Sequence, residues 1–170
     1  MTTSLSPQQR FAAKWKLSAA PSHAPELGPC HVWTGYIPKG DDYARFTADG
    51  RSHRAHRWAW EQENGPVPAG MLVDHKCHRP ACVRVSHLRL ASRKQNAEHQ
   101  LSARRDNRSS AYRGVTWHKT KQRWCVQATH NGRNHHGGVF LDEHEAGAAA
   151  AALRSRLFTH NDADRGSAAA

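Results

Sequence analysis

The 170-residue sequence contains no apolar run of about 18 residues, the length at which a helix becomes a candidate membrane span. Its first residues, Met1–Ser4, also lack the basic segment and apolar core of a secretory signal peptide. We therefore expect no membrane span and a cytoplasmic location. Cysteine is scarce, and four cysteines in such a location favour free thiols or metal ligands over disulfides.

Acidic residues are few beside basic ones. Fourteen Asp and Glu stand against 25 Lys and Arg, which gives a formal net charge of +11. Such an excess indicates a polyanionic partner, with nucleic acid as the first candidate. Histidine and tryptophan are abundant instead, with 14 and six residues, and the histidines favour metal binding. The length is sufficient for one ordinary domain or two small ones.

A cluster of thiols and imidazoles lies in the middle of the chain. Counted from His75, Cys77 lies two residues on, Cys82 seven and His87 twelve. Two thiols and one imidazole provide three of the four ligands of a tetrahedral zinc ion. Cys30, on an upstream segment, is the predicted fourth ligand; the alternative for Cys30 is a buried structural thiol.

The segments around this cluster predict a hairpin followed by a helix. Residues 71–73 are a short apolar run, and residues 85–90 alternate apolar and polar side chains as a half-buried strand does. Ser92 is a suitable N-cap for a helix that begins at Arg93 and ends near Ala103. The expected order is strand, metal-held loop, strand and helix.

This order and spacing resemble those of the HNH/His-Cys-box nucleases, which have a ββα-metal fold. The resemblance covers roughly residues 28–100 and implies that His75 is the general base. It implies that Asn96, 21 residues further on, holds a divalent metal on the scissile phosphate. Asp74 matches an acidic residue that many HNH members use as a second metal ligand. The structural zinc ligands of the His-Cys-box branch match Cys77, Cys82 and His87, with Cys30 completing the set.

The chain departs from the HNH pattern in one place. Where related chains read Cys-Val-Asn-Pro-x-His-Leu, residues 82–88 read Cys-Val-Arg-Val-Ser-His-Leu. The missing asparagine leaves open what orients His75, because a catalytic imidazole needs its other ring nitrogen held.

An arginine near the catalytic metal would bind the phosphate and neutralise charge as the leaving oxygen departs. His56 and Arg57 match a His-Arg pair that often precedes the HNH core, and Arg57 is the predicted clamp, ahead of Arg54 and Arg45. The alternative is that Arg57 is solvated or only positions a phosphate. Two kinds of metal are expected, because oxygen ligands suit Mg²⁺ or Mn²⁺ whereas thiolates suit Zn²⁺.

Residues 112–158 predict a second module of three strands and one helix. An Asn-Gly pair between the last two strands favours a tight hairpin turn. Asp142 caps the helix, and Glu145 three residues later completes a capping box. The expected strands cover residues 112–117, 123–129 and 135–140.

The pattern Tyr-Arg-Gly-Val-x-Trp, Arg-Trp-x-Val, Gly-x-Phe and an alanine-rich helix resembles the Apetala/ethylene-response-factor (ERF) DNA-binding domain. Eight basic residues and one acid lie between residues 101 and 140, and a basic sheet backed by a less basic helix suits a DNA major groove. In that family, sheet arginines and tryptophans contact DNA; the alternative for each tryptophan is a place in the core. The predicted contacts are Arg113, Trp117, Lys119, Lys121, Arg123, Trp124 and Arg133.

The predicted fold class is α+β, with a zinc-stabilised ββα-metal nuclease domain and a small three-stranded antiparallel sheet packed on one helix. The expected divisions are an N-terminal arm (1–27), the nuclease domain (28–101), a basic linker (102–111), the ERF-type DNA-binding domain (112–158) and a C-terminal tail (159–170).

The two resemblances together imply a homing-type endonuclease of a phage or mobile element that cleaves double-stranded DNA inside a bacterial host. Whether it cuts one strand or both depends on whether the chain forms a homodimer, which the sequence leaves open. The first alternative is a non-catalytic, zinc-containing transcriptional regulator that binds DNA. An RNA-binding zinc protein is the second.

Overall fold

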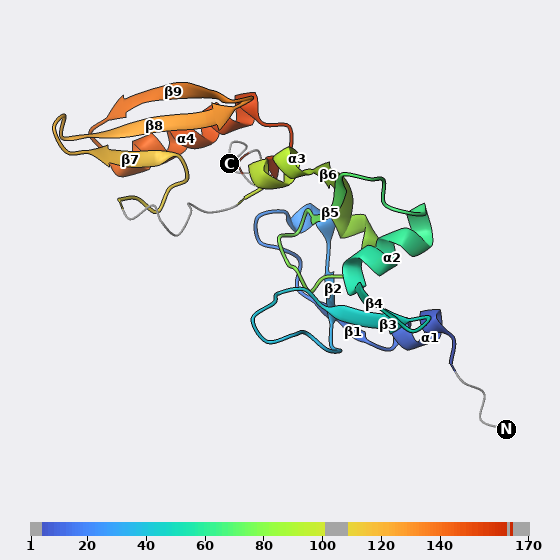
Figure 1. Cartoon of the computed structure of the whole chain (residues 1–170). Helices are drawn as coiled ribbons and strands as arrows, with labels where there is room; N and C mark the ends of the chain where they lie inside the picture. Colours follow the sequence, from blue (N-terminus) through green and yellow to red (C-terminus); the bar gives the residue numbers. More distant parts are fainter. Residues whose placement is uncertain (1–4, 101–108, 163, 165–170) are drawn as a thin grey trace. The chain divides into compact units, whose positions relative to one another are not determined.

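The computed structural model describes residues 5–100, 109–162 and 164, and the chain divides into two units, Met1–Arg93 and Lys94–Ala170. Over the described residues the fold is mixed α+β, with three two-stranded sheets and one three-stranded sheet (Figure 1). In this part of the chain, no helix combines the length and the apolar character that crossing a bilayer requires.

The first unit begins with folded elements where an arm was expected. Helix α1 (Pro7–Ala12) precedes strand β1 (Trp15–Ser18), which pairs antiparallel with β2 (Cys30–Trp33). Phe11 of α1 is buried in the core, in ring contact with two tryptophans. The expectation of an arm over residues 1–27 is therefore wrong where α1 and β1 fold, and its first four residues lie outside the described ones.

A second hairpin and a helix complete this core. Strand β3 (Arg45–Ala48) pairs with β4 (Arg51–Arg54), and helix α2 (Ala55–Asn64) begins at the next residue. Phe46 of β3 and Trp58 of α2 are buried edge to face, with ring centroids 4.7 Å apart. A buried aromatic side chain of this kind contributes about 1.5–3 kcal/mol through removal from water, so these contacts fix α2 on the hairpin.

The predicted hairpin around the thiol cluster is present. Strand β5 (Met71–His75) pairs antiparallel with β6 (Leu88–Ser92), and a short 3-10 turn, η2 (Val85–His87), precedes β6. Helix α3 (Arg93–Glu98) follows β6 without an intervening residue. The division between the units falls after Arg93, so nearly all of α3 belongs to the second unit.

The second unit contains a three-stranded antiparallel sheet with one helix along a face (Figure 1). Its strands are β7 (Val115–His118), β8 (Arg123–His130) and β9 (Arg133–Phe140), and its helix is α4 (Glu143–Leu157). The Asp142 carboxylate caps α4, as predicted, by accepting a hydrogen bond from a backbone N–H. The buried core consists of Val115, Val126, Ala128, Ala146, Ala150, Leu153 and Phe158.

Parts of the predicted division of the chain lie outside the described residues. These are residues 102–108 of the linker, and residue 163 and residues 165–170 of the tail. The domain limits at residues 101 and 112 stay predictions, and the ERF family assignment of the second module stays one too.

Candidate active site and metal centre

The four predicted zinc ligands converge in the first unit. Cys30 comes from β2, and Cys77, Cys82 and His87 come from the loop between β5 and β6; all four are buried, with ligand atoms within 4.8 Å of one another. His87 Nδ1 lies 3.5 Å from Cys30 Sγ and 3.7 Å from Cys82 Sγ. Tetrahedral zinc, with Zn–S about 2.3 Å and Zn–N about 2.0 Å, would place N and S about 3.6 Å apart. The Cys₃His group is consistent with a structural zinc site.

Hydrogen bonds prepare these groups for a cation. His87 Nε2 donates to the Leu27 carbonyl in the turn η1 (Pro25–Leu27) at 2.9 Å, which leaves the lone pair on Nδ1 facing the thiols. Hydrogen bonding from the Cys77 thiol lowers the pKa of Cys82 to about 5, and the same bond with burial raises the pKa of Cys77. One thiolate therefore forms readily, and bound zinc would favour ionisation of the others.

The backbone also joins the ligand loop to β2. Trp33 N donates to the Ala81 carbonyl at 2.9 Å, and Val83 N donates to the His31 carbonyl at 2.8 Å. These bonds surround Cys82, so the loop is held on both sides of one ligand.

His75, the predicted general base, lies at the end of β5 and is buried. Its Nε2 lies 2.9 Å from the carbonyl oxygen of Cys82. A carbonyl can only accept, so Nε2 carries the hydrogen and the neutral ring has its lone pair on Nδ1. The sequence left open what orients His75, and a backbone carbonyl of a zinc-ligand residue fills that role. Sequence reasoning missed it because every residue type carries such a carbonyl.

Aromatic rings pack beside His75. The His56 and His75 ring centroids are 4.5 Å apart, and Tyr43 lies 5.2 Å from His56 and 6.1 Å from His75. The Arg54 guanidinium lies over the Tyr43 ring, 4.3 Å from its centroid. Burial, reinforced by the neighbouring His75 and Arg54, lowers the pKa of His56 to about 3. The neighbour of His75 is therefore an uncharged imidazole at neutral pH.

The two predicted ligands of a catalytic metal lie in different units. Asp74 is buried on β5, and its Oδ2 accepts a hydrogen bond from Arg89 Nε, directly opposite on β6, at 3.1 Å. Sequence reasoning missed the pairing of Arg89 with Asp74. The alternation of residues 85–90 gave only a weak indication of it, because it placed Arg89 on the polar side of a strand. Asn96 is exposed on α3 and belongs to the second unit. The role of each stays a prediction.

The three candidate arginines have different partners. Arg57, the first choice from the sequence, forms an exposed ion pair with Glu61 on the same helix, with Nε and Oε1 2.9 Å apart. Arg45 pairs with Asp41, with an N–O distance of 3.1 Å. Arg54, in contrast, packs on the ring of Tyr43, beside His56 and His75.

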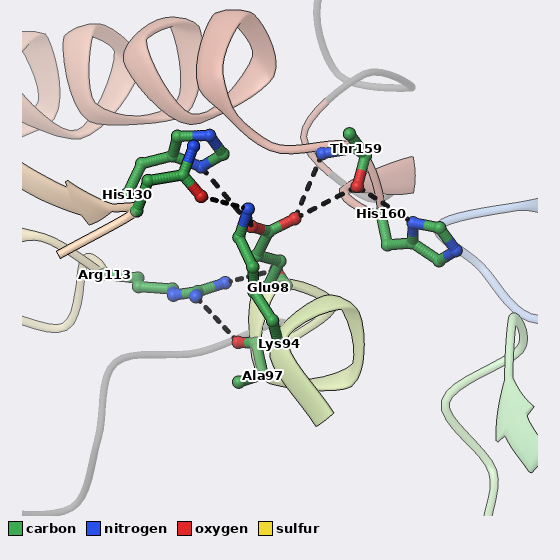
Figure 2. A network of polar contacts seen from close by, with 8 residues as sticks. Lys94, Ala97, Glu98, Arg113, His130, Thr159 and His160 are labelled. Atoms are coloured by element: carbon green, nitrogen blue, oxygen red, sulfur yellow. Dashed lines mark hydrogen bonds and ion pairs between the residues drawn. The ribbon is translucent and has the colours of Figure 1, made fainter. Parts of the chain in front are cut away.

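The predicted DNA contacts also differ in their surroundings. Arg113 donates hydrogen bonds to backbone carbonyls at the end of α3 (Figure 2). Trp124 packs against the core, and its ring centroid is 4.9 Å from that of Trp117. Arg123 is partly exposed and donates to the Gln122 carbonyl. The exposed members of the set are Lys119, Lys121 and Arg133. DNA contact stays a prediction for all seven residues.

Comparison with known proteins gives a family match for the segment around this site. Residues 53–98 match the HNH endonuclease family, a segment that contains His56, Asp74, His75 and Asn96.

Relatives come from two bacteriophages. The chain is 31% identical to Protein 3.8 of Escherichia phage T7 over 85 residues, which are 50% of this chain and 69% of the relative, and it belongs to the same family. It is 36% identical to Protein 7.7 of that phage over 73 residues, which are 43% of this chain and 55% of the relative. It is also 36% identical to the uncharacterized gene 5.3 protein of Enterobacteria phage T3 over 66 residues, which are 35% of this chain and 64% of the relative.

The chain thus spans about half the length of Protein 7.7. No solved structure matches it.

Proposed function

We propose that this protein is a metal-dependent DNA endonuclease of the homing type, with His75 as its general base. The observation that supports this most is the hydrogen bond from His75 Nε2 to the Cys82 carbonyl, because it assigns the basic lone pair to Nδ1. The same histidine lies inside the segment that matches the HNH endonuclease family. Relatives encoded by phages support a mobile-element context.

In this proposal, His75 Nδ1 takes a proton from water, and the resulting hydroxide attacks the scissile phosphorus in line. The bond from phosphorus to the 3′ oxygen breaks, and the released oxygen takes up a proton from solvent. Asp74 and Asn96 would hold Mg²⁺ or Mn²⁺, since a carboxylate and an amide offer the hard oxygens that these cations prefer. The cation would neutralise charge on the phosphate and on the leaving oxygen. Because Asp74 Oδ2 accepts from Arg89, its binding to a cation would compete with this hydrogen bond.

Two residues near His75 and Tyr43, His56 and Arg54, support this chemistry. His56 is uncharged near neutral pH and therefore adds no positive charge that would favour protonation of His75. Arg54 is a better candidate than Arg57 for the phosphate clamp, because its guanidinium lies over Tyr43 whereas that of Arg57 is paired with an acid.

The second unit is proposed to bind duplex DNA as an ERF-type module. Its support is a three-stranded sheet backed by one helix, with exposed basic side chains in the loops and on the last strand. Lys119 and Lys121 lie in the turn after β7, and Arg133 begins β9. Their role would be affinity for the site, while the first unit supplies the base.

The test is cleavage of supercoiled plasmid at low salt with Mg²⁺ or Mn²⁺, where nonspecific DNA binding is strong. His75→Ala should slow cleavage by about 10²–10⁴-fold, the usual contribution of a general base, with duplex affinity nearly unchanged. His53→Ala, on β4 of the same unit, is the matched control. In the same assay Arg54→Met should slow cleavage more than Arg57→Met.

EDTA should abolish cleavage by the wild-type protein. If wild-type protein binds duplex DNA yet cuts neither plasmid nor phage genomic DNA with either cation, the nuclease proposal is wrong and a DNA-binding regulator is favoured. Equal cleavage by His75→Ala and wild type would remove His75 from the mechanism.

A further inference from the structure

We infer that Arg113 and Glu98, which contact α3 within the C-terminal unit, are positioning residues for Asn96. This inference rests on the proposed function, because it takes Asn96 as a ligand of the catalytic metal. It gives the C-terminal unit a part in cleavage that is separate from DNA affinity.

Arg113 closes the C-terminal end of α3. Its Nη1 donates to the Glu98 carbonyl at 2.8 Å, and its Nη2 donates to the Ala97 carbonyl at 3.0 Å (Figure 2). Nη1 also donates to the Gln100 carbonyl at 2.9 Å. The last carbonyls of a helix lack partners within the helix and carry partial negative charge, so a guanidinium there both satisfies and neutralises them. A helix of only six residues is unstable by itself in water, and α3 therefore depends on such contacts.

The Glu98 side chain fixes the same helix from its buried face. Glu98 is 5% exposed, and its carboxylate accepts from the backbone N–H of Thr159 at 3.1 Å and the hydroxyl of Thr159 at 3.3 Å (Figure 2). It also lies 3.4 Å from His130 Nδ1 and 3.5 Å from Lys94 Nζ. Lys94 Nζ donates in turn to Asn131 Oδ1 at 2.6 Å. Helix α3 is thus held by three segments: the end of β8, the turn after β8 and the segment that follows α4.

The opposite face of α3 carries Asn96. Lys94 and Glu98 are four residues apart and share one helix face, whereas Asn96 is two residues from each, about 200° around a helix of 3.6 residues per turn. Asn96 is accordingly exposed while Glu98 is buried. Anchoring α3 through Lys94 and Glu98 therefore fixes the direction of Asn96 without occupying its amide.

The decisive variant is Arg113→Lys. Lysine keeps the positive charge, so long-range attraction to DNA is retained, but it loses the planar fork that reaches several carbonyls at once. We expect the metal concentration for half-maximal plasmid cleavage to rise by about 10–100-fold, as for other groups that orient metal ligands. Duplex affinity should stay within about twofold, because the number of charges that can meet phosphates is unchanged. Arg156→Lys, exposed on α4, is the matched control.

A second variant, Glu98→Gln, keeps the shape and an acceptor for Thr159 but removes the charge opposite Lys94 and His130. It should raise the half-maximal metal concentration in the same direction, and high Mn²⁺ should restore cleavage by both variants. Such rescue distinguishes a displaced ligand from a loss of folding. Should Arg113→Lys fail to fold, Glu98→Gln decides the matter.

Four outcomes would overturn the inference. Unchanged metal dependence in a folded variant would show that α3 needs no such anchor. A parallel fall in duplex affinity and cleavage would assign Arg113 to DNA contact. If wild-type protein does not cut, the proposed function fails and this inference fails with it. If wild-type protein cuts and Asn96→Ala does not, while both positioning variants behave as wild type, the inference alone fails.

Discussion

His56 is a buried histidine that the fold keeps uncharged. It is 3% exposed, and burial together with nearby His75 and Arg54 lowers its pKa to about 3. In an unfolded chain the same imidazole would take up a proton below about pH 6.5. Between those two values the unfolded state binds one proton more than the folded state at this residue. Acid therefore favours unfolding of the first unit through His56.

Replacing His56 by Gln should reduce the pH dependence of stability. In the wild-type protein, His56 should lower the free energy of unfolding by about 2 kcal/mol as the pH falls from 7 to 5, and the loss should continue towards pH 3. Gln does not titrate, so its variant lacks this contribution. Urea unfolding of both proteins at pH 7 and pH 5 measures the difference, and equal pH dependence in the two would contradict it.

At the residue scale, the sequence predicted which side chains come together better than it predicted how each side chain is oriented. The grouping of Cys77, Cys82 and His87 could be predicted from spacing because the chemistry of thiols and imidazoles resides in their side chains. The contact of His75 with the Cys82 carbonyl could not, because backbone atoms leave no mark in composition. Arg57 was preferred over Arg54 from its place beside His56. The two differ in tertiary and local contacts, since Arg54 packs on Tyr43 whereas Arg57 pairs with Glu61.

Helix α4 carries a glycine at a point of close approach. A Cβ at Gly147 would lie 2.6 Å from Tyr112 Cδ1 and within 2.9 Å of two further ring atoms. The Tyr112 hydroxyl is joined to His144 Nδ1 at 2.6 Å, which restricts movement of the ring. Gly147 is therefore required by packing against the segment before β7, and helix propensity alone would favour alanine there.

Gly147→Ala should consequently destabilise the second unit. Helix propensity would give a gain of roughly 0.5–1 kcal/mol, but overpacking against the ring typically costs about 1–3 kcal/mol, so the net effect is a loss. Thermal unfolding followed by circular dichroism measures it. The double variant with Tyr112→Leu should recover part of the loss, whereas a higher melting temperature for Gly147→Ala would refute the packing argument.

At the element scale, patterns with strong periodicity or turn chemistry were predictable. The Asn131-Gly132 turn was found because both residues adopt positive φ, 50° and 73°, which few residue pairs tolerate. Helix α1 and strand β1 were missed because their apolar residues are few. Their stability comes from Phe11, which inserts between aromatic rings supplied by distant segments.

Among the described residues, each of the two units has an apolar core of its own. One gathers the aromatic residues of the first unit, and the other lies between the β7–β9 sheet and α4. The Cys₃His cluster belongs to the first unit alone. Structural zinc contributes about 10–16 kcal/mol of apparent binding free energy in small zinc domains, which is comparable to the whole stability of a domain.

Removal of zinc should therefore unfold the first unit and spare the second. Calorimetry of the full chain should show two transitions, of which a zinc chelator removes one. Cys77→Ser should have the same effect as the chelator, whereas Cys125→Ser, on β8 of the other unit, should leave the zinc-dependent transition in place. Loss of both transitions on chelation would mean that the two cores unfold as one.

For the whole molecule, the different patterns of the two halves of the sequence indicated two modules. The sequence did not predict that α3 would pack with the second unit. The predicted nuclease domain ends at residue 101, whereas the division between compact units falls after Arg93. The reason is tertiary, since Arg113 and Thr159, far along the chain, hold α3. Spacing within residues 75–96 carries no information about them.

Strand β6 continues directly into α3, and this affects where two related proteins can be joined in a chimera. The segment that matches the HNH endonuclease family extends to residue 98, beyond the point where the second compact unit begins. A chimera joined within residues 101–108 would set α3 against a foreign surface without Arg113 or Thr159. A junction directly after Ser92 would transfer α3 together with its own partners. An exchange of C-terminal units should therefore use the junction after Ser92, because α3 then keeps its contacts with Arg113 and Thr159.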